Sequence, residues 1–579
     1  MLATSRSAEG AGDYPVAGLL DWMESPRAGR GLYFANDAGG FDLVEFPRLA
    51  ELVMAAAEEI AAVAARPGGA ISLQLPTGPG FVSAFIGSLV AGYTPSPLPP
   101  PTFMRNQEHY VAQLTDVIRA ADPAAIVSDP AFAEAAAQAA ERAGTGFAPV
   151  ELELSGDGSG FERRAPADLA LLQFTSGSSG RPRGVEITWA NLESNIRMIR
   201  HWLRMRPDDQ TVTWLPLYHD MGLIGCLLTP IVNQSDVWIF RPDQFIVNPR
   251  RWIECLGTRA VEIAVSPSFG FAYAAKHVRP EHVEDHDFSA WRIAICGAER
   301  LDPEALRRFS ELLAPRGFRP ETFLPAYGLA EATLAVTGVH VPDVPRAVRP
   351  DWDGLRFGYE LEIEAEAPID DADTIGDGSG WLVGCGPPLL GAAVEIVDDE
   401  GDSLGEDRVG EIAVIADTVA RGYQGGDNVG STSFSPDGLR TGDAGFVHGG
   451  ELYVVGRIGD ALKTRGRAVF VEDLEAKVCA HAGLPKGRVA VLAGTAAGAD
   501  SLVALVEVDP GGWEEEVGAL LARELGPDGV VRVLAGPRGT IQRTSSGKPR
   551  RRVLWRQLLE GALEADVVYE RANGAARPV

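Results

Sequence analysis

A loop of small and hydroxylated residues lies near the end of the first third of the chain. It runs from Thr175 to Gly184 with the sequence TSGSSGRPRG, directly after the apolar stretch Leu169–Phe174. Such a loop exposes backbone N–H groups and hydroxyls without bulky side chains, which is what a polyphosphate needs close around it. The loop does not contain the Walker A pattern. A flexible Ser/Gly linker is the alternative interpretation of this segment.

A second segment combines aromatic, polar and apolar residues between Trp214 and Gly225, with the sequence WLPLYHDMGLIG. His219 and Asp220 within it could orient a carboxylate at the edge of an apolar pocket, or gate its entry. A histidine in apolar surroundings can equally be a satisfied structural residue, since its ring nitrogens readily find local partners.

A third segment, Pro325–Thr333 (PAYGLAEAT), has the pattern of a strand end followed by a glycine turn and a helix. Ligands of open α/β sheets bind beyond the carboxyl ends of the strands. Tyr327 could therefore stack on a base while Glu331 binds a metal ion. A helix N-terminus that carries a favourable acidic residue is the simpler alternative.

Further short motifs occur at Gly297-Ala298-Glu299, Gly410-Glu411-Ile412, Leu439–Asp443 (LRTGD), Gly456-Arg457 and Thr544–Lys548 (TSSGK). Together with the three longer segments, and in this order, they resemble the core motifs of the adenylate-forming superfamily. That superfamily contains acyl-CoA synthetases, nonribosomal peptide adenylation domains and luciferases. The sequences of the segments that begin at Trp214, Gly297 and Tyr327 are most similar to those of the fatty acyl-AMP ligases.

The resemblance implies a ligase that uses ATP and Mg2+ to convert a long-chain or bulky apolar carboxylic acid into an acyl-adenylate, with release of pyrophosphate. The acyl group then passes to a thiol, of an acyl carrier protein in many fatty acyl-AMP ligases. An acyl-CoA ligase of the same fold is a near alternative. A non-catalytic nucleotide-binding scaffold is an alternative of another class, and its expected mark would be the loss of Glu331, Asp443 or Lys548. All three are present.

The resemblance also implies roles for individual residues. Lys548 is the expected catalytic cation, because a fixed ammonium stabilises the negative charge that builds on the α-phosphoryl oxygens. Glu331 and Thr175 would hold Mg2+. Glu331 and His219 are expected, with Lys548, to be the catalytic residues. The nucleotide would be bound by Thr175, Ser176, Gly177, Ser178, Gly180, Gly297, Ala298, Glu299, Tyr327, Gly328, Asp443 and Arg457. The acyl substrate would contact Asp220, Met221, Ser266 and Phe269. For Met221 and Phe269, a plain core position is the alternative.

The chain departs from the family pattern at a few positions. Arg183 stands where lysine is usual in the phosphate loop, and Cys296 where the fatty acyl-AMP ligases often have asparagine. Gly459 replaces the Asp or Lys about which the small domain swings in the family. Glycine widens the backbone angles available to a hinge without defining either end state. This departure concerns the thiol-transfer half-reaction more than adenylation.

The pattern of the elements that must position these residues predicts an α/β fold. A helical pattern over 47–65 precedes apolar strands at 70–75, 124–128, 169–174, 263–265 and 293–296, which is typical of sheets covered by helices on both faces. Short strands with Gly/Asp turns after about Val383 indicate a small β-rich subdomain. We predict a large N-terminal domain over 1–458 and a small, mobile α+β C-terminal domain over 459–579. The loop 370–380 and the ends 1–12 and 570–579 are expected to be mobile or loosely ordered.

Composition limits the partners. The formal net charge is −28, which disfavours nucleic acid and anionic membranes as ligands. The five cysteines are far apart, with no spacing typical of a zinc site or a disulfide framework. We see neither a secretory signal pattern at 1–22 nor an apolar run long enough for a membrane span, and therefore expect a cytoplasmic protein.

Overall fold

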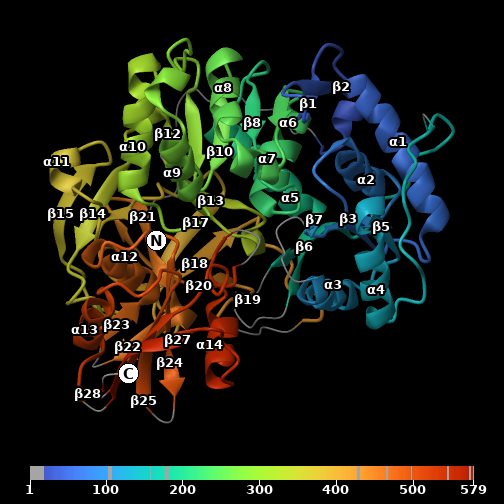
Figure 1. Ribbon diagram of the computed structural model, residues 1–579. Coiled ribbons are helices and arrows are strands. Elements are labelled where there is room, and N and C mark those ends of the chain that lie inside the picture. The colour runs from blue at the N-terminus through green and yellow to red at the C-terminus, as the bar shows by residue number, and fades with distance from the viewer. Residues whose placement is uncertain are drawn as a thin grey trace.

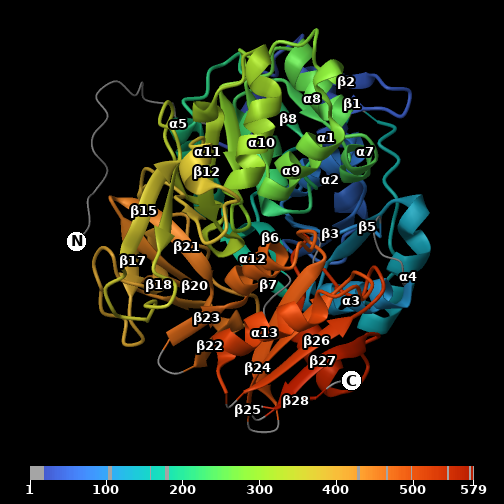
Figure 2. The same ribbon diagram turned by 60° about the vertical axis from the view of Figure 1, so that its left-hand side comes forward.

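The computed structural model describes residues 18–101, 107–156, 158–175, 182–426, 431–464, 467–496, 499–527, 529–543, 547–572 and 575–577. A large N-terminal unit of sheets and helices adjoins a smaller unit made by the end of the chain (Figures 1 and 2). The predicted α/β class, with a β-rich part and an α+β C-terminal part, is confirmed.

An eight-stranded sheet forms the centre of the large unit. Its strand order is β13 (Ala335–Gly338), β12 (Phe323–Gly328), β11 (Ile293–Cys296), β10 (Ile263–Ser266), β8 (Thr211–Thr213), β9 (Val237–Ile239), β1 (Gly31–Ala35) and β2 (Phe41–Glu45). The six inner strands are parallel, and β13 and β2 are antiparallel edges. Because parallel strands end at one edge, the residues after β10, β11 and β12 are brought together.

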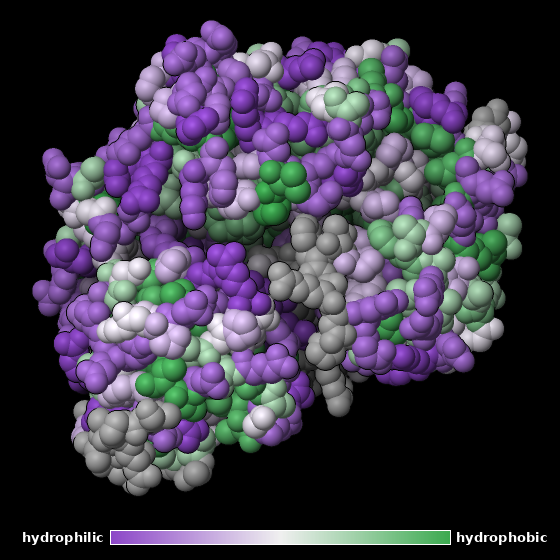
Figure 3. Space-filling model, in the orientation of Figure 1, coloured by the Kyte–Doolittle hydropathy of each residue, from purple (hydrophilic) through white to green (hydrophobic). Residues whose placement is uncertain are grey.

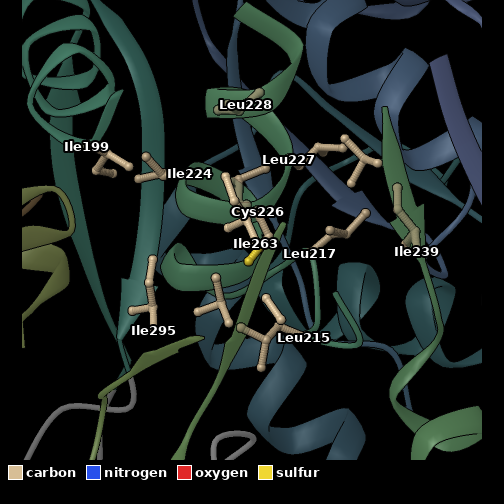
Figure 4. Packing of buried hydrophobic residues seen from close by; sticks show 14 of the residues in the cluster. Ile199, Leu215, Leu217, Ile224, Cys226, Leu227, Leu228, Ile239, Ile263 and Ile295 are labelled. Atoms are coloured by element: carbon tan, nitrogen blue, oxygen red, sulfur yellow. The ribbon is translucent and has the colours of Figure 1, made fainter. Parts of the chain in front are cut away.

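Helices cover both faces of this sheet. On one face lie α8 (Arg250–Thr258), α9 (Ser268–His277) and α10 (Pro303–Leu313). Trp252 of α8 packs on Phe309 of α10, and rings of α9 and α10 pack against Phe323 of β12. On the other face lie α5 (Trp189–Trp202) and a π-helix (Met221–Leu228). Figure 4 shows Ile199 and Ile224 of these helices with Ile263 and Ile295 of the sheet in one apolar cluster. The short helix α6 (Thr229–Val232) continues this layer, whereas α7 (Pro242–Val247) packs through Phe245 against α8 and α9.

A second, smaller sheet carries the phosphate-loop hairpin. Strands β4 (Thr94–Pro97), β3 (Ala70–Gln74) and β5 (Ala125–Ser128) are parallel, and α1 (Phe46–Val63), α2 (Pro79–Val90), α3 (Gln107–Ala121) and α4 (Ala133–Ala143) pack around them. The hairpin consists of β6 (Leu169–Thr175) and β7 (Arg183–Thr188), with Thr175 opposite Arg183 at the end where the connecting loop begins. The Thr94 hydroxyl donates to the Leu169 carbonyl over 3.0 Å, which joins the hairpin to the sheet.

The β-rich part follows the eight-stranded sheet in the chain. It contains a three-stranded sheet of β15 (Ile363–Pro368), β14 (Arg346–Pro350) and β16 (Leu382–Val383). Beside it lies a sheet of β17 (Ala392–Val397), β18 (Gly410–Ala416), β20 (Gly438–His448) and β19 (Ser433–Ser435), in which β21 (Glu451–Arg457) also pairs with β20.

The segment 370–380, expected to be a mobile surface loop, contains the one-turn helix α11 (Ala372–Ile375). The Asp371 side chain accepts hydrogen bonds from the Thr374 backbone N–H and hydroxyl, and Ile375 is buried. A capping aspartate and one buried apolar side chain are thus enough to order this turn.

The C-terminal unit has its own core. A hairpin of β22 (Ala461–Thr464) and β23 (Arg467–Phe470) leads into a sheet of β24 (Val489–Ala496), β25 (Ala499–Val506), β26 (Val530–Ala535), β27 (Asp566–Ala572) and β28 (Ala575–Arg577). Helices α12 (Val471–His481), α13 (Glu514–Leu525) and α14 (Arg551–Leu559) accompany it. The expectation of a loose end from residue 570 was wrong within the described part, because β27 pairs with β26 and continues to Ala572.

Ion pairs join the two units. The Lys486 ammonium lies 2.5 Å from the Asp302 carboxylate and 3.3 Å from that of Glu304, at the N-terminus of α10. Arg300 lies 3.8 Å from Asp473 of α12. These contacts hold the C-terminal unit against the edge of the large sheet where β11 ends.

The surface is mostly hydrophilic. Figure 3 shows hydrophilic residues over most of the face seen in Figure 1, with smaller apolar patches between them. No helix among the described residues is long and apolar enough to cross a lipid bilayer.

Replacing Phe309 by alanine tests the core that positions the sheet. Phe309 is fully buried, with rings of Trp291, Phe318 and Phe323 around it. We expect Phe309→Ala to lower the free energy of unfolding by about 3–5 kcal/mol, because it leaves a cavity among these rings. Denaturant unfolding followed by tryptophan fluorescence measures this loss. Phe269→Ala, the same change at a ring that is 39% exposed, is the matched control, and an equal loss there would contradict the packing account.

Candidate active site

The carboxyl ends of three parallel strands meet beside the β-rich part and the C-terminal unit. Ser266 ends β10, Cys296 ends β11 just before Gly297, and Gly328 ends β12. Strand β20 brings Asp443 to the same place, as its hydrogen bond to Tyr327 shows. Asp443 and Tyr327, both singled out in the sequence, are thereby brought together with the ends of these strands.

Asp443 is the centre of a buried hydrogen-bonded group. Its Oδ2 accepts a hydrogen bond of 2.7 Å from the Tyr327 hydroxyl, and its Oδ1 lies 2.8 Å from Nε of Arg457. Asp443 and Arg457 face each other across the β20–β21 ladder, so the pair is fixed by strand register. The charge of Asp443 raises the pKa of Arg457, and burial raises the pKa of Tyr327 well above its ordinary value.

The backbone around this group leaves no room for side chains at two glycines. A Cβ added to Gly297 would approach the Ala326 carbonyl oxygen to 2.8 Å, and one added to Gly328 would overlap that of Leu334. Ala298, which follows Gly297, has a φ of 68°, in the left-handed region. Such a conformation in a non-glycine residue costs free energy and persists where surrounding structure imposes it. The loops form a close backbone cradle at the strand ends.

Glu331 lies in a short 3₁₀ turn, Ala330–Ala332, and its side chain is almost fully buried. Its Oε1 accepts a hydrogen bond of 2.5 Å from the Tyr423 hydroxyl. Thr175 ends β6, and its hydroxyl is buried without a hydrogen-bond partner among the described residues. Ser176, Gly177, Ser178 and Gly180 lie outside the described residues, so their predicted contacts with phosphate stay predictions.

His219 and Asp220 form an ion pair at the start of the π-helix. Nδ1 of His219 lies 2.6 Å from Oδ1 of Asp220, and that oxygen also caps the helix by accepting from the Met221 N–H. Burial lowers the pKa of His219, but the charge and hydrogen bond of Asp220 outweigh burial and raise it. Burial likewise raises the pKa of Asp220, yet His219 brings it below the usual value. The pair therefore favours its charged form.

Glu299 is hydrogen-bonded to the first turn of α9. Its Oε1 accepts hydrogen bonds of 2.8 Å from the Ser268 hydroxyl and from the Phe269 N–H, at the first turn of α9. Burial raises the pKa of Glu299. The loop 297–299 is thereby tied to the helix that carries Phe269, next to Ser266 of β10.

An aromatic wall adjoins this helix. The Trp214 ring stacks on Phe245 with centroids 4.0 Å apart and meets Phe269 edge-on at 5.8 Å. Gly270 allows α9 to lie close to Ser266 and Trp214, since a Cβ there would collide with the hydroxyl of Ser266. Met221 packs, partly buried, against the same apolar core. The predicted acyl-side residues thus lie on neighbouring elements with an apolar lining.

Lys548 reaches this site from the C-terminal unit. Its side chain is exposed to solvent, yet protein groups surround it closely enough that burial, with the charge of Arg457, lowers the pKa of its ammonium. The carboxylates of Asp443, Glu299 and Asp220 act in the opposite direction. The three acidic groups belong to the predicted nucleotide and acyl sites, so the ammonium is within electrostatic reach of both sites.

The donor set fits magnesium bound mainly through phosphates. Among the described residues, no three His, Cys, Asp or Glu side chains converge as a metal site. Mg2+ is commonly held by one or two carboxylates together with substrate phosphates and water. Glu331 and the unpartnered hydroxyl of Thr175 match that need.

Sequence reasoning missed two groups. Tyr423 contacts Glu331 but was not singled out, although it is the single aromatic residue in the glycine-rich stretch 422–426. Ser268, which lies between the predicted acyl-site residues Ser266 and Phe269, donates its hydroxyl to Glu299. Hydrogen-bond partners distant in the chain have no local signal in the sequence.

Comparison with known proteins agrees with this geometry. The family model of the AMP-binding enzymes matches residues 43–424. A protein of Caulobacter vibrioides named as an acyl-CoA synthetase is 32% identical over 552 residues, covering 93% of this chain and 94% of its own. The medium-chain-fatty-acid–acyl-carrier-protein ligase JamA of Moorena producens is 30% identical, covering 87% and 88%.

A solved structure supports the same conclusion. It comes from structural and functional studies of fatty acyl-adenylate ligases from E. coli and L. pneumophila, and it superposes with a TM-score of 0.83 at 28% identity, covering 95% of this chain and 98% of that one. The ordered motifs, the cleft at the strand ends and these matches lead to one assignment. This chain belongs to the family of AMP-binding, adenylate-forming enzymes.

Proposed function

We propose that this chain joins a carboxylic acid to the α-phosphorus of ATP, releases pyrophosphate, and then passes the acyl group to a thiol. The observation that carries the proposal is the position of Lys548. Its ammonium, contributed by the C-terminal unit, is within electrostatic reach of Asp220, Glu299 and Asp443, which line the two predicted substrate sites. The acid and the nucleotide would meet beside it.

The nucleotide would lie along the strand ends. Each carboxylate oxygen of Asp443 has two lone pairs, and Tyr327 and Arg457 use one on each. The remaining pairs suit the two hydroxyls of a ribose. The Tyr327 ring and the loop 297–299 would then border the base, where Gly297 and Gly328 let the backbone approach closely.

The phosphates would lie toward the β6–β7 hairpin. Glu331 and Thr175 would hold Mg2+, and that ion, when bound, neutralises phosphate charge. The chain's own contribution is the Lys548 ammonium, which would stabilise the negative charge that forms when the acid's carboxylate attacks. Only five of the 52 basic residues are lysines, so a lysine at position 548 is uncommon for this composition.

The acyl group would extend along α9 and the π-helix. Trp214 and Phe269 offer aromatic surface, and His219 with Asp220 supplies the charged pair at this end. Apolar walls with few polar anchors suit a long-chain or bulky apolar acid.

We expect the thiol that accepts the acyl group to belong to a carrier protein. JamA is by name a ligase to an acyl carrier protein, whereas the Caulobacter protein is named for coenzyme A. We propose the division 1–458 and 459–579 as the two bodies that rearrange between the half-reactions. Gly459 lies at this boundary, and glycine allows a wide range of backbone angles for such a movement. The Lys486 contacts with α10 would have to open during such a movement.

Lys548→Ala tests the adenylation step. We expect acid-dependent ATP–pyrophosphate exchange to fall by about 10²–10³-fold, the usual cost of one preorganised charge, while ATP binding is retained. Lys276→Ala, which removes an exposed ammonium on the outer end of α9, is the matched control. Undiminished exchange in Lys548→Ala would contradict the assigned role. Absence of exchange in the unaltered chain with any acid tested would instead favour a non-catalytic scaffold.

A second experiment identifies the acceptor. Incubation with ATP, a series of fatty acids and either coenzyme A or a phosphopantetheinylated carrier protein is expected to give the carrier thioester as the main product. Mass spectrometry of both thioesters measures the partition. Accumulation of acyl-CoA with no carrier thioester would establish the acyl-CoA ligase alternative.

The charged state of His219 gives a pH test. His219 has a raised pKa and Asp220 a lowered one, so their interaction stabilises the folded chain between these two pKa values and is lost above the first and below the second. In Asp220→Asn, burial acts without its opposing charge, so we expect the pKa of His219 to fall below its ordinary value. Histidine-selective NMR titration measures it, with Asp208→Asn, a remote surface carboxylate, as control. An unchanged titration in Asp220→Asn would exclude this coupling.

A further inference from the structure

Tyr423 connects the proposed phosphate side of the cleft to Glu331. Its ring is 5% exposed, and its hydroxyl donates to Oε1 of Glu331 over 2.5 Å. Among the described residues, Oε2 of Glu331 accepts no hydrogen bond. One oxygen of this carboxylate is thus held and the other is left for a ligand.

The segment that carries Tyr423 is fixed on both sides. The Ala420 N–H donates to the Glu331 carbonyl over 2.9 Å, so backbone and side chain of Glu331 are both bound by this segment. On its other side, Gln424 N–H donates to the Gly184 carbonyl over 2.8 Å, and Glu186 N–H to that of Gly422 over 2.9 Å. The segment therefore bridges β7 of the phosphate-loop hairpin and the turn of Glu331.

The Tyr423 ring itself is held from two directions. The Arg183 guanidinium lies over it, 4.2 Å from the ring centroid, and Phe434 meets it edge-on at 5.1 Å. A cation over a ring face and an edge-on neighbour restrict the rotation of the ring. The hydroxyl is thereby directed at Glu331, and Arg183, at the mouth of the hairpin, is packed on the same ring.

We propose that Tyr423 is a positioning residue for the metal–nucleotide complex: its hydroxyl orients the Glu331 carboxylate so that Oε2 faces the metal, and its ring aligns Arg183 of the hairpin with that carboxylate. This inference rests on the proposed function, in which Glu331 holds Mg2+. Groups that orient a metal-binding carboxylate typically change metal affinity by about 10- to 100-fold when they are removed.

The test is Tyr423→Phe, which removes the hydroxyl and keeps the ring under Arg183. We expect Mn2+ to bind about tenfold more weakly in the presence of a non-hydrolysable ATP analogue, as measured by electron paramagnetic resonance. The Mg2+ concentration for half-maximal pyrophosphate exchange should rise by a similar factor, and saturating Mg2+ should restore most of the rate. Glu331→Gln should weaken Mn2+ binding further and resist this rescue.

Tyr273→Phe is the matched control, because its hydroxyl donates to a backbone carbonyl, that of Ile246, away from Glu331. Mn2+ affinity that is weakened in Glu331→Gln and unchanged in Tyr423→Phe would overturn the positioning role and leave the proposed function standing. Unchanged affinity in both variants would overturn the metal role of Glu331 itself. An equal loss in Tyr273→Phe would also overturn the inference. Phe434→Leu, which frees the ring but keeps the hydroxyl, should give a smaller loss in the same direction and serves if Tyr423→Phe fails to fold.

Discussion

The ion pair between the buried Asp443 and the partly exposed Arg457 is the interaction on which the rest of the site depends. Strand register places the two residues opposite each other, and the Tyr327 hydroxyl adds the end of the eight-stranded sheet to the pair. The consecutive strands β20 and β21 are thereby joined to the end of β12, 116 positions before Asp443. Bonds from two directions orient the Asp443 carboxylate. An oriented carboxylate with unused lone pairs is well suited to bind a diol.

An acidic chain must overcome its own charge to bind an acidic nucleotide. The formal net charge is −28, so the general field repels a triphosphate. Arg457, Arg183 and Lys548 supply local positive charge around the cleft, two of them from β strands and the third from the C-terminal unit. Because Lys548 comes from a separate unit, its position depends on how that unit packs on the large one. In the proposed rearrangement of the two units, the same dependence would allow the cation to be withdrawn after adenylation.

Much of the fold was readable because local patterns determine it. The helix expected at 47–65 is observed as α1 (Phe46–Val63), and the strand expected at 70–75 as β3 (Ala70–Gln74), since apolar periodicity and turn residues act over short distances. The order of the motifs also indicated that Asp443, Tyr327 and Lys548 should converge. The contacts of Tyr423 and the hydrogen bonds of Glu299 to α9 were not predictable, because they join residues 92 and 30 positions apart without any local pattern. The helix at 372–375 was hidden by a Gly/Asp-rich composition whose capping bonds depend on exact geometry.

A crystal structure with a bound acyl-sulfamate analogue of the acyl-adenylate is the most direct test of the central claim, that Asp443 and Lys548 bind one nucleotide from two units. The account predicts both ribose hydroxyls within about 2.6–3.2 Å of the Asp443 carboxylate, with the Lys548 amino group beside the sulfamate. It also predicts that the Tyr327 and Arg457 bonds persist. An analogue whose ribose lies elsewhere, with Asp443 bonded only to Tyr327 and Arg457, would contradict it.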